Sequence, residues 1–217
     1  ESPMPVTDIN AWTGHGLTYP LAGSVAAIHR ALTSIGVQRV CLGPLDAVWC
    51  HDPHALNAPL YSAAQEYGEI LAAPVLDPTV PRWEEELATA VERGAALVKL
   101  VPAYSGYGLA EAAPLLAALA GTSLPCLVQV RLEDPRHHHP LAQVPDFPAA
   151  EAARWAEAHP GVRLVLGGAA AGGLMALRDM LQGQANLYAD LSQVDGMDAV
   201  RRLVDAGLQE KLLFGTH

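Results

Sequence analysis

Segments typical of buried strands alternate with segments typical of amphipathic helices along the whole chain of 217 residues. Short apolar runs bounded by Gly or Pro indicate strands, and longer stretches with capping residues indicate helices. Such alternation implies parallel strands that are joined by right-handed crossover connections. The sequence therefore predicts a single α/β domain over residues 1–217.

The number of predicted elements favours a (β/α)8 TIM-type barrel. Strands are expected at residues 6–11, 37–42, 70–75, 96–101, 125–132, 162–166, 187–191 and 211–214. Helices are expected at residues 24–35, 55–67, 82–93, 110–120, 149–159, 172–181 and 197–206. No helix signal follows the last strand, so the eighth helix is expected to be missing or truncated. An open parallel sheet stays the alternative, but no Gly-x-Gly-x-x-Gly follows the first strand, which disfavours dinucleotide binding.

Charge and cysteine usage limit the classes of partner. The formal net charge of -10 argues against nucleic acid or an anionic membrane as a partner. No apolar run reaches the roughly 18 residues of a membrane span, and we expect no signal peptide before the first strand. The three cysteines show no CxxC spacing, which favours a reducing cytoplasm. We expect a small-molecule ligand, with a homo-oligomer left open.

Polar side chains end several of the predicted strands. They are Asn10, Lys99, Gln129, Asp190 and His217. In a barrel, the carboxyl ends of the strands and the loops after them form the functional face. We therefore expect these five residues to lie together at one mouth.

The order of several segments resembles the amidohydrolase superfamily, in its amidohydrolase-2 (decarboxylase-like) branch. The segments that carry the resemblance are Thr7–Gly14, Val98–Pro102, Leu124–Gln129, His159–Gly168, Leu187–Ser192 and Leu213–His217. The resemblance implies a barrel whose strand ends hold a divalent metal, usually zinc, which activates a bound water.

The positions of the metal ligands in that branch are occupied by other residues here. The branch has His-x-His on the first strand, a His at the end of the fifth and of the sixth, and an Asp after Phe-Gly-Thr on the last. This chain has Asn10, Trp12, Gln129, Gly168 and His217 at those positions. Amides are poor zinc ligands, and indole and glycine offer no lone pair. We therefore expect a degenerate metal site and no cofactor, with zinc relocated to His137, His139 or His217 as the alternative.

The loop at residues 131–140 is the densest polar run in the chain. Alternation along the strand expected at 125–132 places Gln129 and Arg131 on the same face. Arg131 and Arg136 could bind a carboxylate in bidentate fashion near Lys99, and His137 and His139 share one side of an extended segment. Two prolines restrict the backbone, which favours an ordered lid over the mouth. A solvated loop whose charges pair locally is the alternative.

The resemblance implies an enzyme that acts on a small organic compound by hydrolysis or decarboxylation, and the Arg and His side chains of the loop favour an anionic compound. Lys99, Asp190 and His217 are the expected catalytic residues. The expected substrate-binding residues are Asn10, Trp12, Gln129, Arg131, Arg136, His137 and His139. A non-catalytic barrel that binds a small carboxylate and an interaction protein of the same fold are the alternatives, and Trp12 filling the former metal position would favour either.

Overall fold

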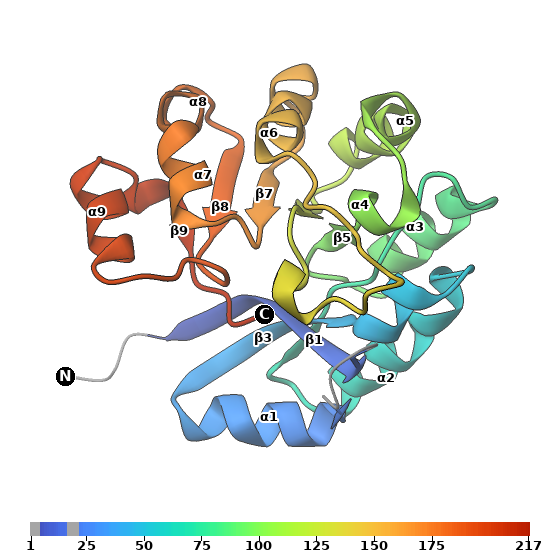
Figure 1. The fold of residues 1–217 in the computed structure, drawn as a ribbon. Coiled ribbons are helices and arrows are strands. Elements are labelled where there is room, and N and C mark those ends of the chain that lie inside the picture. The colour runs from blue at the N-terminus through green and yellow to red at the C-terminus, as the bar shows by residue number, and fades with distance from the viewer. Residues whose placement is uncertain (1–4, 17–21) are drawn as a thin grey trace.

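The structure, a computed structural model, describes residues 5–16 and 22–217. Strands and helices alternate through these residues as the sequence predicts, with the helices on the outside (Figure 1). The strands are β1 (Val6–His15), β2 (Ala22–Gly23), β3 (Val37–Pro44), β4 (Ile70–Ala72), β5 (Val98–Leu100), β6 (Cys126–Gln129), β7 (Leu164–Gly167), β8 (Leu187–Asp190) and β9 (Leu212–Leu213).

The helices pack over the strands along an apolar layer. They are α1 (Val25–Ser34), α2 (Ala58–Glu66), α3 (Trp83–Glu92), α4 (Pro102–Ser105), α5 (Leu109–Ala120), α6 (Ala149–Ala158), α7 (Ala171–Ala176), α8 (Arg178–Gly183) and α9 (Ala199–Asp205). Ser24 caps α1, because its side chain accepts from the backbone N–H of Ala27. The helix predicted at 172–181 is divided at Leu177, whose backbone leaves the helical region. Within the described residues, no helix combines the length and the apolar character that crossing a membrane requires.

The strands form two hydrogen-bonded sheets, in the orders β2-β1-β3-β4 and β5-β6-β7-β8-β9. All pairs are parallel except β1 with the short β2. Hydrogen bonds also cross both junctions between the sheets. Leu76 N–H donates to the Lys99 carbonyl at 3.0 Å, and Ile9 N–H donates to the Phe214 carbonyl at 2.9 Å. The eight parallel strands therefore have the (β/α)8 TIM-type arrangement that the sequence predicts.

Inside the ring of strands, small apolar side chains lie below the polar strand ends. Cys41, Ala73, Leu97, Leu127 and Val165 form this cluster, and all are buried. Parallel pairing places Lys99 opposite Leu127, so the Lys99 side chain points to the same interior. The apolar floor removes the polar strand ends from solvent on one side.

The fifth parallel strand is shorter than predicted, and this changes the direction of one arginine. The expected strand at 125–132 ends at Gln129, whose side-chain amide donates to the Arg131 carbonyl at 2.7 Å. The chain turns there, and the Arg131 guanidinium lies 3.3 Å from Asp134. The expectation that Gln129 and Arg131 share one face of a strand is therefore wrong.

Candidate functional site

Asn10 is the centre of a buried hydrogen-bond network that connects four strands. Its Nδ2 donates to Asp190 Oδ2 at 2.6 Å and to Gln129 Oε1 at 3.1 Å. Its Oδ1 accepts from Lys99 Nζ at 2.9 Å. Gln129 Nε2 lies 3.5 Å from His217 Nδ1. The structure thus brings Asn10, Lys99, Gln129, Asp190 and His217 together at the carboxyl ends of the strands.

Lys99 is fully buried at the centre of this network. Its ammonium donates to the Ala11 carbonyl at 2.7 Å and lies 3.8 Å from the centroid of the Trp12 ring. Burial lowers the pKa of Lys99 to about 7, while the nearby Cys41, Asp8 and Asp190 oppose that shift. The interactions around Lys99 favour the charged form, and the loss of hydration disfavours it.

Two buried carboxylates fix the geometry around Asn10. Asp190 accepts from the Gly168 N–H at 2.9 Å and from the Ser192 hydroxyl at 2.9 Å, and burial raises its pKa. Asp8 accepts from the Asn10 N–H at 2.9 Å and from the Thr216 N–H at 3.2 Å. Asp8 therefore connects β1 to the segment after β9, while Asp190 orients the Asn10 amide.

His217 reaches the cavity from the end of the chain. Its Nε2 lies against the Leu132 carbonyl, and its ring meets the Trp12 ring edge-on at 6.4 Å between centroids. Burial lowers the pKa of His217 to about 4, so the imidazole is neutral near pH 7. An Nε2–H that donates to Leu132 leaves Nδ1 as the basic nitrogen.

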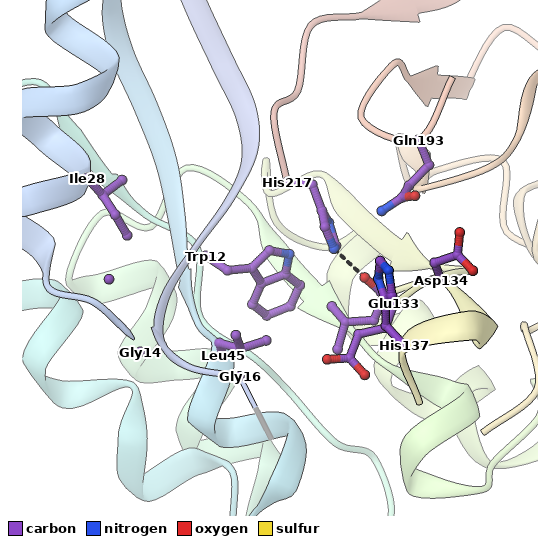
Figure 2. Close-up of a pocket in the computed structure, with 12 residues that line it drawn as sticks. Trp12, Gly14, Gly16, Ile28, Leu45, Glu133, Asp134, His137, Gln193 and His217 are labelled. Carbon is purple, nitrogen blue, oxygen red and sulfur yellow. Dashed lines mark hydrogen bonds between the residues drawn. The ribbon is translucent and has the colours of Figure 1, made fainter. Parts of the chain in front are cut away.

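A cavity of about 670 Å³ opens at this end of the strands. Its lining residues are Trp12, Gly14, Gly16, Gly23, Ile28, Leu45, Leu132, Glu133, Asp134, His137, Gln193 and His217. Figure 2 shows Trp12 in the middle of this lining, with His217 and His137 on one side of it. Asn10, Lys99, Gln129 and Asp190 do not line the cavity, so of the central network only His217 faces it.

The loop after β6 contributes one wall of the cavity. Leu132, Glu133, Asp134 and His137 all belong to its lining. Figure 1 shows this yellow segment beside the C-terminus. The first part of the loop therefore borders the cavity at the strand ends.

The arginines of this loop do not converge on Lys99. Arg131 and Arg136 both pair with Asp134, at 3.3 and 2.5 Å. The two guanidinium groups hold the pKa of Asp134 well below its usual range, with the Arg136 hydrogen bonds as the main cause. Arg136 is largely exposed, and His139 Nδ1 accepts from the Leu141 N–H at 3.1 Å. None of Arg131, Arg136 and His139 lines the cavity.

The residues at the strand ends do not fit a divalent metal. The two amides are already used, with Asn10 Oδ1 on Lys99 and Gln129 Oε1 on Asn10. Trp12 has no lone pair to donate, and a side chain at Gly168 would meet the Arg131 carbonyl 2.2 Å from its Cβ. Across residues 5–16 and 22–217, His, Cys, Asp and Glu form no group of three that could hold a metal, including around His137 and His139.

Sequence reasoning missed two kinds of site residue. Gly43 lies beside the Lys99 stem, where an added Cβ would be 2.9 Å from Lys99 Cδ. A glycine near the end of a buried strand was the available signal. Leu132 and Gln193 line the cavity from loops, and no local pattern marked them.

Comparisons with known proteins agree on family and fold. A family model described as Amidohydrolase matches residues 46–216, which is most of the chain. A search of the curated proteins gave no match. The match includes Lys99, Gln129 and Asp190 of the network described above, whereas Asn10, Trp12 and His217 lie outside the matched residues.

Several solved structures share the fold at low sequence identity. The TIM-barrel protein Bb4693 of Bordetella bronchiseptica is 13% identical with a TM-score of 0.69, over 98% of this chain and 85% of that chain. The IDCase of Metarhizium anisopliae is 17% identical with a TM-score of 0.65, over 92% and 68%. An amidohydrolase of Burkholderia multivorans with bound HEPES is 14% identical with a TM-score of 0.63, over 98% and 84%. At these identities the likeness concerns the fold alone.

Proposed function

Because this chain belongs to the amidohydrolase family, we propose that its cavity binds a small organic compound without the metal centre that the fold usually carries. The position of Trp12 carries this proposal. Trp12 lines the cavity and lies over Lys99, so it separates the buried polar network from any ligand. A pocket of a few hundred Å³ with an aromatic wall is typical of small-molecule sites.

One buried donor without an acceptor favours a ligand that carries an oxygen atom. Trp12 Nε1 is buried and has no hydrogen-bond partner within the described residues, and the Trp12 side chain lines the cavity. Buried donors are normally paired in folded proteins, with water or a ligand where protein atoms are lacking. A carboxylate or carbonyl group on the ligand would supply the acceptor.

The charge of the loop after β6 favours an anionic ligand. Arg131, Arg136 and Asp134 form one cluster, in which two guanidinium groups share one carboxylate. The cluster therefore carries one excess positive charge; its Asp134 lines the cavity, and the two arginines lie outside the lining. Glu133 lines the same cavity and carries the opposite charge. Replacing Glu133 and replacing Arg131 should therefore change the affinity for an anion in opposite directions.

A binding measurement with matched pairs of ligands tests this proposal. Carboxylates and their neutral amides, such as benzoate and benzamide, would be titrated while tryptophan fluorescence is recorded, with Trp12→Phe to identify the signal. We expect Arg131→Ala to weaken carboxylate binding roughly tenfold, about 1.4 kcal/mol. Glu133→Gln should strengthen it, and neither variant should change amide binding. Equal changes for both ligands would remove the anionic preference, and the absence of any Trp12 response would remove the cavity as the site.

His217 supports a second candidate function, in which the bound compound undergoes hydrolysis or decarboxylation. Its imidazole lies in the cavity wall and is neutral near pH 7, so Nδ1 can accept a proton. Lys99 and Asp190, the other expected catalytic residues, are fully buried and would act only through Asn10 and Gln129.

Turnover and binding separate the two candidates. Product release from activated esters and from carboxylates would be followed for the native chain and for His217→Asn. In the catalytic case the variant loses turnover and keeps ligand affinity. In the binding case the native chain shows affinity without turnover, and His217→Asn changes affinity alone.

A further inference from the structure

The Lys99 ammonium lies among the strand-end residues whose counterparts hold the metal in the related branch. Its Nζ contacts three consecutive residues of β1: it donates to Asn10 Oδ1 and the Ala11 carbonyl, and it lies over the Trp12 ring. Asn10 connects it to Gln129. We infer that the Lys99 ammonium takes the place of a divalent cation at the centre of the barrel mouth. This assignment goes beyond the proposed function, because it holds whether or not the cavity turns its ligand over.

The space around Lys99 is shaped for a lysine. Gly43 leaves room for the lysine stem, since a Cβ at position 43 would lie 2.9 Å from Cδ and 3.2 Å from Cε. Gly168 has a φ of +74°, and a Cβ there would lie 2.2 Å from the Arg131 carbonyl oxygen. A histidine is therefore excluded at position 168. Gly43 thus leaves space for the lysine side chain, and the backbone at Gly168 leaves no space for a metal-binding side chain.

The polarity of the network also fits an ammonium. An ammonium needs acceptors, and it finds Asn10 Oδ1 at 2.9 Å, the Ala11 carbonyl at 2.7 Å and the face of an indole ring. The Asn10 amide then presents its N–H groups to Asp190 and Gln129. The positive charge is thus connected to the Asp190 carboxylate through one oriented amide.

Charge balance gives a reason for a cation at this place. Asp8 and Asp190 are both fully buried at the same strand ends. A buried carboxylate without a nearby cation is strongly disfavoured. Among the described residues, Lys99 is the one buried lysine or arginine. It is therefore the side chain that can balance the charge of these two carboxylates.

Metal titration of ligand-restored variants tests the inference. The variant Asn10→His/Trp12→His/Gln129→His keeps His217 and offers four imidazoles, and it would be made with and without Lys99→Met. Each folded protein would be titrated with Co²⁺ alone and its absorption recorded. We expect one equivalent of tetrahedral Co²⁺ to bind when Lys99 is replaced, and binding at least tenfold weaker when the ammonium is present. Equal binding in both backgrounds, or no binding in either, would overturn the inference.

Chemical rescue tests the same idea without new ligands. Lys99→Ala removes a group equivalent to propylammonium, so propylammonium should raise its Tm by roughly 5 °C or more at saturation. Propan-1-ol, which has the same shape without the charge, should give a much smaller shift. Leu127→Ala, which opens an apolar space in the same interior, is the control. Propylammonium and propan-1-ol should change its Tm by the same amount. Equal rescue of Lys99→Ala by the alcohol would overturn the inference.

Discussion

The buried network around Lys99 and the charged loop after β6 use their charges in opposite ways. In the network, partners come from different strands, and Lys99 meets Asn10 across 89 positions of sequence. In the loop, Asp134 pairs with Arg131 and Arg136, which are three and two positions away. The network is removed from water, whereas Arg136 is largely exposed. Each region has three charged side chains, but water screens the charges of the loop and not those of the network. The two regions therefore contribute unequally to stability.

Replacing Lys99 should give the largest effect. Lys99→Met removes the charge and leaves Asn10 Oδ1 and the buried carboxylates without their cation, so we expect a loss of about 3–5 kcal/mol in the free energy of unfolding. Urea denaturation followed by circular dichroism measures it. Lys211→Met, at a partly buried lysine that donates to the Gln184 carbonyl, is the matched control and should cost about 1 kcal/mol or less. Similar losses for both lysines would mean that full burial in the network adds nothing to the contribution of Lys99.

The pH dependence of stability should report the burial of His217. Its pKa in the folded chain is about 4, below the ordinary value of 6.5. A group with a depressed folded-state pKa stabilises the fold above the unfolded-state pKa, and that contribution is lost as pH falls. We therefore expect the native chain to lose roughly 3 kcal/mol between pH 6.5 and 4 relative to His217→Asn. Parallel stability curves for the two proteins would contradict the buried, neutral imidazole.

A methyl group at Gly43 should cost about 1–3 kcal/mol, because it overlaps with the Lys99 stem. The same change in a Lys99→Ala background should cost less, since only the contact with the Ala73 carbonyl at 3.0 Å remains. Thermal unfolding of the four proteins gives this double-mutant cycle. Gly172→Ala, at a helical glycine with open space around it, is the control and should be neutral or stabilising. Additive losses at Gly43 and Lys99 would show that the two residues do not share space.

Removing the exposed arginine of the loop should give the smallest effect. Arg136→Ala leaves Asp134 paired with Arg131, so we expect no measurable change in the urea midpoint. Arg82→Ala, which breaks another exposed pair with Glu85, should behave in the same way. A shift at Arg136 comparable to that of Lys99→Met would mean that the loop is a structural part of the barrel mouth.

Arg131 shows where reasoning from the sequence reached its limit. Alternation along a strand predicted that it would share a face with Gln129, but the strand ends at Gln129 and the chain turns. The turn depends on a side-chain hydrogen bond from Gln129 to the Arg131 carbonyl, which no propensity encodes. The Arg131 guanidinium then pairs with Asp134, three positions along the chain, instead of pointing toward Lys99.

The sequence by itself determined the order of strands and helices, and with it the mouth where Asn10, Lys99, Gln129, Asp190 and His217 meet. Local periodicity and capping suffice for this, because parallel strands bring their carboxyl ends to the same edge.

Only the tertiary structure decided which polar groups face the ligand. Trp12 covers Lys99, Asn10 divides its amide between Lys99 and Asp190, and His217 alone of this network reaches the cavity. These outcomes depend on side-chain packing among strands that are distant in sequence. The local pattern gives the end of the barrel at which a side chain lies, and the packing determines whether water and ligands can reach it.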